Sequence, residues 1–347
     1  MKPITLYHVS TCKNLGSQRG LTLVEVMIAI TISLVLLTGV MQIFTGSRQT
    51  YRVQDNMARV QENGRFAMDF LKKNLRMADH WGCMRNTAML TNNLNGSVGV
   101  GTTAGLTGTN GLANAPDTIT LATATSSGIT VTGTMPTSSA VINTSPHTLA
   151  VNDIVIISNC TNGDVFQVTH LPGTGIGHNS GAGTPGNTFS NPSSSCPGAA
   201  TNCLSADYGP GAEVLSFQTV TYSIALDPAN NSIPTLFQAV GGAAPQALVE
   251  GVEDMQILYG EDTDLRVPNA PLTVANLTAD RYVPAGTAGL VMNNVVSIRI
   301  GLVLRTAENN LAITPQVYTN LQGVTTTAAD RRLRRVFSST IQLRNRV

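Results

Sequence analysis

The segment QRGLTLVEVMIAITISLVLLTGVMQIF, residues 18–44, decides the fold of this chain. Its apolar run, residues 21–44, would extend about 36 Å as an α-helix, which is enough to cross a bilayer core of about 30 Å. Residues 1–20 contain Lys2, Lys13 and Arg19 but no acidic side chain, which is typical of an N-terminus that stays in the cytoplasm. We therefore expect a membrane-spanning helix. No small-residue cleavage site follows Phe44, so a plain signal anchor is one interpretation.

A carboxylate near the start of the apolar run argues against a plain anchor. An isolated charge at that depth costs about 2 to 4 kcal/mol, so Glu25 needs a partner. The sequence GLTLVE, residues 20–25, resembles the type III signal of type IV prepilins. The resemblance implies cleavage after Gly20, N-methylation of the new first residue Leu21, and retention of Glu25 in the membrane. The new amine on Leu21 would then pair with Glu25 of a neighbouring subunit, so that two buried charges become one pair.

The five cysteines fit a chain whose head lies outside the cytoplasm. Cys12 belongs to the leader, residues 1–20, and four cysteines remain after cleavage: Cys83, Cys160, Cys196 and Cys203. An even number in an oxidising compartment predicts two disulfides. Three connectivities are open; we favour Cys196 with Cys203, which closes a short loop, and Cys83 with Cys160. No C-x-x-C pair supports a zinc site.

A helical pattern continues through residues 45–80. Small and apolar side chains recur at three- and four-residue spacing, and charged side chains lie opposite them, as in an amphipathic helix. No proline occurs between Pro3 and Pro116, so we expect one helix from Leu21 to Ala78. The predicted buried stripe consists of Met57, Val60, Gly64, Ala67, Met68, Leu71, Leu75 and Ala78.

Residues 47–83, SRQTYRVQDNMARVQENGRFAMDFLKKNLRMADHWGC, resemble the segment after the membrane helix of PilW-type minor pilins. The stretches LVEGVEDMQILYG, residues 248–260, and DRRLRRVFSSTIQLRNR, residues 330–346, resemble the same family more loosely. The resemblance implies an α+β pilin-like fold, in which a long N-terminal helix packs on an antiparallel β-sheet head.

Residues 81–347 have the composition of a β-rich head, with low-complexity loops at 91–150 and 171–211. Two apolar runs around Asn162 and Gly163 predict a hairpin over 153–170. Further strands are predicted at 117–123, 128–133, 220–226, 235–240, 255–260, 295–305 and 336–345. In the strand 295–305 we expect Val296, Ile298, Ile300, Leu302 and Leu304 to face the helix stripe, and the other side to face solvent.

Catalytic and cofactor patterns are weak in this sequence. The histidines lack metal-binding spacing, and no nucleophile motif or G-x-G-x-x-G pattern occurs, so we expect no enzyme and no cofactor. A net charge of +1 argues against direct binding of nucleic acid. Glu261, Asp262 and Asp264 form a weak calcium candidate, because carboxylate-rich loops bind that ion. Arg331, Arg332, Arg334 and Arg335 are interpreted as a solvated strand edge, with acidic partner subunits as the alternative.

The resemblance predicts a structural subunit of a type IV pilus. It implies a minor pilin, cut by prepilin peptidase, that joins other minor pilins and the major pilin, primes assembly on the pilus platform and sits at the tip, often with a large adhesin. Adhesion and twitching motility would follow. The chain would wait in the inner membrane through residues 21–44, with its N-terminus cytoplasmic. A J-type minor pseudopilin of type II secretion is the alternative; a membrane-anchored periplasmic enzyme is a further one.

Overall fold

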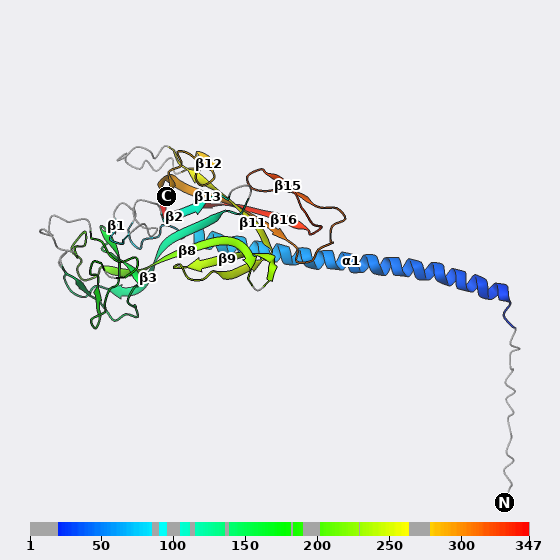
Figure 1. Cartoon of the computed structure of the whole chain (residues 1–347), viewed down its shortest axis with the longest axis horizontal. Coiled ribbons are helices and arrows are strands. Elements are labelled where there is room, and N and C mark those ends of the chain that lie inside the picture. Colours follow the sequence, from blue (N-terminus) through cyan, green and yellow to red (C-terminus); the bar gives the residue numbers. More distant parts are fainter. Residues whose placement is uncertain are drawn as a thin grey trace, which may run out of the picture. The chain divides into compact units, whose positions relative to one another are not determined.

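The computed structural model describes residues 20–84, 90–95, 105–111, 115–135, 139–181, 183–189, 202–228, 230–263 and 278–346. The chain has two compact units, residues 1–54 and residues 55–347. Helix α1 (Leu23–Leu75) forms the described part of the first unit and continues into the second (Figure 1). It ends at Leu75, and residues 76–79 form a turn, so α1 stops before the predicted end at Ala78.

The second part of α1 carries the predicted buried stripe. Val60, Gly64, Ala67, Met68, Leu71, Leu75 and Ala78 are buried, whereas Met57 is half-buried and Asn56 is buried in its place. Gly64 has a packing role, because a Cβ atom built there would lie 2.3 Å from a ring carbon of Phe337. A glycine that weakens an isolated helix therefore allows a sheet to approach it closely.

A four-stranded antiparallel sheet packs on this stripe, in the order β12-β11-β13-β16. Its strands are β11 (Val252–Glu261), β12 (Arg281–Val283), β13 (Val295–Arg305) and β16 (Arg334–Gln342). As predicted, Ile298, Ile300, Leu302 and Leu304 of β13 enter the core beside α1. A register shift opposite Gly260 and Glu261 brings Val295 into that core rather than Val296.

The solvent-facing side predicted for β13 is wrong, because a second hairpin covers part of it. Strands β14 (Val317–Thr319) and β15 (Thr325–Thr327) pair with each other. Leu321 between them lies over Gly301, where a built Cβ atom would approach the Leu321 Cβ to 2.6 Å. Val303 on the same strand is 2 % exposed. Only the tertiary fold reveals this cover, since Leu321 and Gly301 belong to different segments.

The head also contains a larger sheet of eight strands, in the order β1-β6-β5-β8-β3-β2, with β9 on β8 and β10 on β9. Its central strands are long: β3 (Thr118–Thr130), β8 (Glu213–Asp227) and β9 (Asn230–Val240). The shorter strands are β1 (Leu90–Asn92), β2 (Leu106–Thr109), β5 (Ile154–Ser158), β6 (Gly163–Gln167) and β10 (Gln246–Glu250). Leu106, Ile119, Leu121 and Tyr222 of this sheet join the core around α1.

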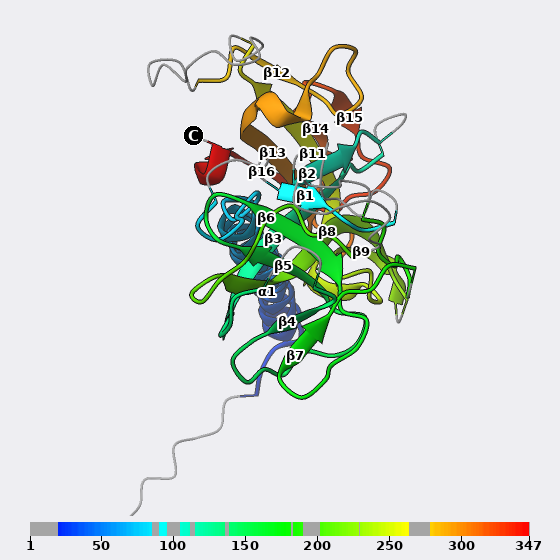
Figure 2. The ribbon, with the colours of Figure 1, turned by 90° about the vertical axis from the view of Figure 1, so that its left-hand side faces the viewer.

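The segments expected to be mostly loop, 91–150 and 171–211, build a second hydrophobic core together with the predicted hairpin 153–170. Residues 118–130, predicted as two short strands, form the single strand β3, which has a register shift between Ser126 and Ile129. Strands β4 (Val141–Asn143) and β7 (Gly175–Gly177) pair below it, on the side of the head away from β12 (Figure 2). The buried members of this core, all from 129–214, include Ile142, Val155, Ile157, Phe166, Val168, Ile176, Leu204 and Tyr208.

Candidate functional site

The start of α1 is a capping box. Thr22 precedes the first helical residue, and Glu25 is the third residue of the helix. The backbone N–H of Glu25 donates to Thr22 Oγ1 over 3.3 Å, while the N–H and hydroxyl of Thr22 donate to Glu25 Oε2 over 3.4 and 3.3 Å. These bonds satisfy two backbone donors that a helix N-terminus leaves open. The T-x-x-E spacing is the sequence signal for this motif, and reasoning from charge alone missed it.

The two oxygens of the Glu25 carboxylate differ in their hydrogen bonds. Within the part of the chain that the structure describes, the local bonds reach Oε2, and Oε1 accepts none. Glu25 is exposed, as are the predicted cleavage residues Gly20 and Leu21. Glu25 is also the sole charged residue between Gly20 and Arg48. An incoming cation would therefore meet a carboxylate that the capping box already holds in place.

The apolar half of α1 has the surface of a membrane helix. Large apolar side chains from Leu21 to Phe44 are 42 to 76 % exposed. The hydroxyls of this segment bond back to the helix, for example Ser33 Oγ to the Ala29 carbonyl over 2.7 Å and Thr38 Oγ1 to the Leu34 carbonyl over 2.8 Å. Such bonds remove the need for water. By length and composition, α1 is the one helix among the described residues able to cross a membrane.

The favoured disulfide between Cys83 and Cys160 is confirmed. It joins the chain just after α1 to the loop between β5 and β6, where Asn159 Oδ1 accepts the N–H groups of Thr161 and Asn162. That loop is the predicted hairpin turn. Cys203 also takes part in a disulfide, and its predicted partner Cys196 lies outside the described residues, so this pairing stays a prediction.

The calcium candidates contribute to the fold in a different way. Glu261 is fully buried and forms an ion pair with Arg281, whose Nη2 lies 2.6 Å from Glu261 Oε2, and its Oε1 accepts the N–H of Val291. Asp262 is buried next to it, and Asp264 lies outside the described residues. No group of three metal-ligating side chains occurs in the described ranges. An arginine already neutralises Glu261, so this carboxylate is engaged within the fold.

Two of the four clustered arginines, Arg332 and Arg334, form an internal ion-pair network, which corrects the solvated-edge interpretation for them, whereas Arg331 is exposed as predicted. The Arg334 side chain is 3 % exposed and binds Glu253 and Asp330, with Nε–Oε2 and Nη1–Oδ1 distances of 2.6 and 2.7 Å. Burial opposes charge on Asp330, but hydrogen bonds from Arg334 and the Arg332 backbone hold its pKa below the ordinary value. Arg335 is exposed, as predicted. Arg334 is buried where Arg335 is not, because the carboxylates of Glu253 and Asp330 neutralise Arg334.

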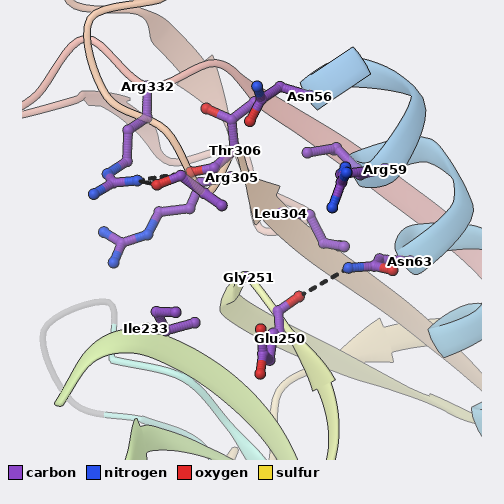
Figure 3. Close-up of a pocket in the computed structure, with 12 residues that line it drawn as sticks. Asn56, Arg59, Asn63, Ile233, Glu250, Gly251, Leu304, Arg305, Thr306 and Arg332 are labelled. Carbon is purple, nitrogen blue, oxygen red and sulfur yellow. Dashed lines mark hydrogen bonds between the residues drawn. The ribbon is translucent and has the colours of Figure 1, made fainter. Parts of the chain in front are cut away.

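A pocket of about 130 Å³ lies beside residues 56–63 of α1 (Figure 3). Its lining includes Asn56, Arg59 and Asn63 of α1 and Arg305 and Arg332 of the head. Asn63 Nδ2 donates to the Glu250 carbonyl over 3.4 Å, and Arg332 Nη1 donates to the Thr306 carbonyl over 3.0 Å. The lining contains no histidine, cysteine or lysine.

The C-terminus fastens the other end of α1, which the sequence did not predict. Asn345 Nδ2 donates to the Ala78 carbonyl over 2.8 Å. Arg346 forms an ion pair with Asp79 and donates to the Val295 carbonyl over 3.0 Å. Both side chains lie at or next to a short 3-10 helix, Arg344–Arg346. The Asn345 amide thus satisfies a carbonyl in the turn after α1, and Arg346 ties that turn, through Asp79, to the start of β13.

The comparisons with known proteins agree with this arrangement. Residues 15–41 match the prokaryotic N-terminal methylation motif, and residues 221–345 match the family described as type IV pilus-assembly protein W. A type IV-like pilin from Thermus thermophilus is similar at 15 % identity over 57 % of this chain and 87 % of its own, with a TM-score of 0.21, too low to bear on the strand arrangement. No curated protein matches. The methylation motif, the family match and the long apolar helix with an antiparallel head together support a PilW-type minor pilin of type IV pili.

Proposed function

We propose that this chain is a minor pilin that is cleaved after Gly20 and docks through Leu21 and Glu25. The capping box at the start of α1 is the observation that carries the proposal. It keeps the Glu25 carboxylate at the helix N-terminus, close to where cleavage would expose an amine on Leu21. A carboxylate in hydrocarbon is tolerated when a cation meets it, and the neighbouring subunit's amine is such a cation.

The exposed apolar half of α1 supports assembly through helix packing. Residues 21–44 would exchange lipid for neighbouring pilin helices, and close packing with the Glu25 pair would supply the net gain. We assign residues 1–20 to the leader, 21–44 to the membrane and filament-core helix, 45–80 to its amphipathic continuation and 81–347 to the head. Prepilin peptidase and the assembly platform would act on the chain in the inner membrane.

Within the pilus, the proposed role of the chain is to prime assembly and to form part of the tip complex. The chain would join other minor pilins before the major pilin is added, remain in the tip complex at the cell surface, and so support adhesion and twitching motility. A deletion strain tests this role against the type II secretion alternative. Loss of surface pili and twitching with normal exoprotein secretion is expected, whereas normal piliation with lost secretion would reverse the assignment.

The docking charge is tested by Glu25→Val in the full chain. We expect N-terminal sequencing to find Leu21 first in both proteins, because cleavage precedes docking, and incorporation into pili to fall at least about tenfold, since a single unpaired charge in lipid costs more than 1.4 kcal/mol. Glu62→Val, on the exposed side of the same helix, is the matched control and should incorporate normally. A filament-associated chain that retains residues 1–20, or normal incorporation of Glu25→Val, contradicts the proposal.

A further inference from the structure

The edge of the four-stranded sheet is an interaction surface for which the docking of α1 does not account. β16 is the outermost strand, nine residues long, and pairs with β13 from Arg334 to Gln342 without a register shift. Its inner side chains hold the sheet to α1, since Phe337 covers Gly64 and Ile341 lies in the core. The strand is therefore fixed firmly by one face and one edge.

The other edge of β16 presents backbone groups without partners. The Leu343 N–H donates to the Val296 carbonyl and the Thr306 N–H to the Leu333 carbonyl, so the odd-numbered residues pair with β13. In an antiparallel ladder, alternate residues then turn their N–H and C=O groups outward. Val336, Ser338, Thr340 and Gln342 are these residues, and all four are exposed. Among the described residues, none of their outward backbone groups has a hydrogen-bond partner.

Among the described residues, β16 has little of the protection that edge strands usually have beyond its first two residues. Soluble proteins shield such edges with charged side chains, above all lysine, or with proline, a bulge or a covering segment. β16 contains no lysine or proline, and its pairing has no bulge. Among the described residues the cover is at its start, where β14 lies close to β16. There Gln316 Oε1 accepts the Arg334 N–H over 2.7 Å and Gln316 Nε2 donates to the Arg334 carbonyl over 3.0 Å. A side-chain amide thus occupies one position that a partner strand would fill, and the next four positions stay open.

Basic side chains flank the open edge. Arg335 at the start of β16 and Arg344 just beyond its end are both exposed. No acidic residue follows Asp330 in the chain. A strand that pairs along 336–342 would therefore meet positive charge near both of its ends, which favours acidic side chains there.

We propose that β16 accepts an extended segment of a neighbouring pilin head by strand addition, and that this segment carries acidic residues near its ends. The inference rests on the proposed function, because helix packing is what would bring a second head beside this sheet. Strand addition supplies main-chain hydrogen bonds along the edge, and the flanking charges fix register and orientation. Pairing of heads would add to the assembled complex a contact independent of Glu25.

Photo-cross-linking of the full chain in its own cells tests the contact. Benzoylphenylalanine is placed at Ser338 on the open edge, at Thr327 on the exposed β15 strand as the matched control, and at Leu34 in the apolar helix. We expect Ser338 to cross-link to an extended head segment of another pilin and Thr327 to give no such product. Cross-links from Leu34 to pilins without any from Ser338 overturn strand addition alone. Absence of both would overturn the proposed function as well.

Proline substitution tests the hydrogen bonds themselves. Ser338→Pro removes an outward N–H that makes no bond within the head, whereas Ser338→Ala keeps it. We expect Ser338→Pro to lower incorporation into pili about tenfold or more, the effect of losing about 1.4 kcal/mol, and Ser338→Ala to stay within about twofold. An unchanged melting temperature of the purified full chain shows that the head still folds; if it falls, Thr340→Pro is compared with Thr340→Ala. Equal incorporation of proline and alanine variants overturns the proposal.

The charge requirement has its own variant. Arg335→Glu combined with Arg344→Glu should lower the Ser338 cross-link yield several-fold, because two attractions become repulsions. Arg331→Glu, an exposed arginine outside the edge, is the matched control and should leave the yield unchanged. An unchanged yield in the double variant contradicts the acidic character of the added segment.

Discussion

The two halves of α1 share one helical backbone and have opposite surroundings. From Leu21 to Phe44 the large apolar side chains are exposed on all sides. From Val60 to Leu75 one stripe is buried, with Leu71 and Leu75 at 0 % exposure, and the other side is charged. The first half can be stabilised by lipid or by neighbouring helices, whereas the second half is stabilised by its own head. Changes in the two halves should therefore appear in different measurements.

The largest contrast is expected for one substitution made in both halves. Leu71→Ala should lower the free energy of unfolding of the head by about 2 to 5 kcal/mol, because it leaves a cavity in a fully buried site. Denaturant unfolding of the full chain in detergent measures this change. Leu34→Ala is the matched control in the exposed half and should leave the midpoint unchanged. A shared shift would mean that the two halves unfold as one unit.

Acid should weaken the head and spare the apolar half of α1. His178 is fully buried between Phe166 and Phe189, with ring centroids 5.1 and 5.6 Å away, and burial lowers its pKa from 6.5 to about 4. Its folded form stays neutral while the unfolded form is protonated below pH 6.5. Stability from this group is complete above pH 6.5 and falls by about 3 kcal/mol as the pH drops toward 4.

Unfolding midpoints measured between pH 7.5 and 4 check this prediction. The variant His178→Phe, which cannot titrate, should show a flatter pH profile relative to its own stability at pH 7.5. An equally steep profile in the variant would assign the acid sensitivity to other groups.

The smallest contrast concerns two helical glycines. Replacing glycine by alanine within a helix normally stabilises it by about 1 kcal/mol. Gly46→Ala should follow that rule, because nothing lies within 4 Å of the added atom. Gly64→Ala forces the Phe337 ring away and should destabilise the head by about 1 to 3 kcal/mol despite the better helix propensity. Helix content by circular dichroism of the full chain in detergent measures the Gly46→Ala effect, and thermal unfolding of the head measures the Gly64→Ala effect. A head that Gly64→Ala stabilises would show that the Phe337 ring moves aside without cost.

Much of the architecture was predictable because it depends on local periodicity. The apolar run, the amphipathic stripe and the alternation in 295–305 each bury a face whose spacing is visible in the chain. Counting cysteines once the leader was set aside predicted two disulfides with three connectivities open, and the favoured Cys83–Cys160 pair is present. The capping box also has a local signal, Thr22 and Glu25 three residues apart, and attention to charge alone overlooked it.

The failures involve residues that meet across long sequence separations. The sequence pattern does not distinguish Arg334 from Arg335. In the structure, Arg334 is buried in ion pairs with Glu253 and Asp330, whereas Arg335 is exposed. Leu321 covers Gly301, and the C-terminal Arg346 meets Asp79 at the end of α1. These pairs do not recur at a regular sequence spacing, so hydrophobic periodicity cannot predict them.

The sequence by itself determined that a long apolar helix carries one acid near its start and continues into an amphipathic stripe, because hydrophobic spacing and charge placement are properties of neighbouring residues. Tertiary structure alone decided which cations are neutralised, which sheet face is covered and which edge is left open. Those outcomes depend on contacts between distant segments, and each is fixed by the free energy of burying particular groups together rather than by the order of residues along the chain.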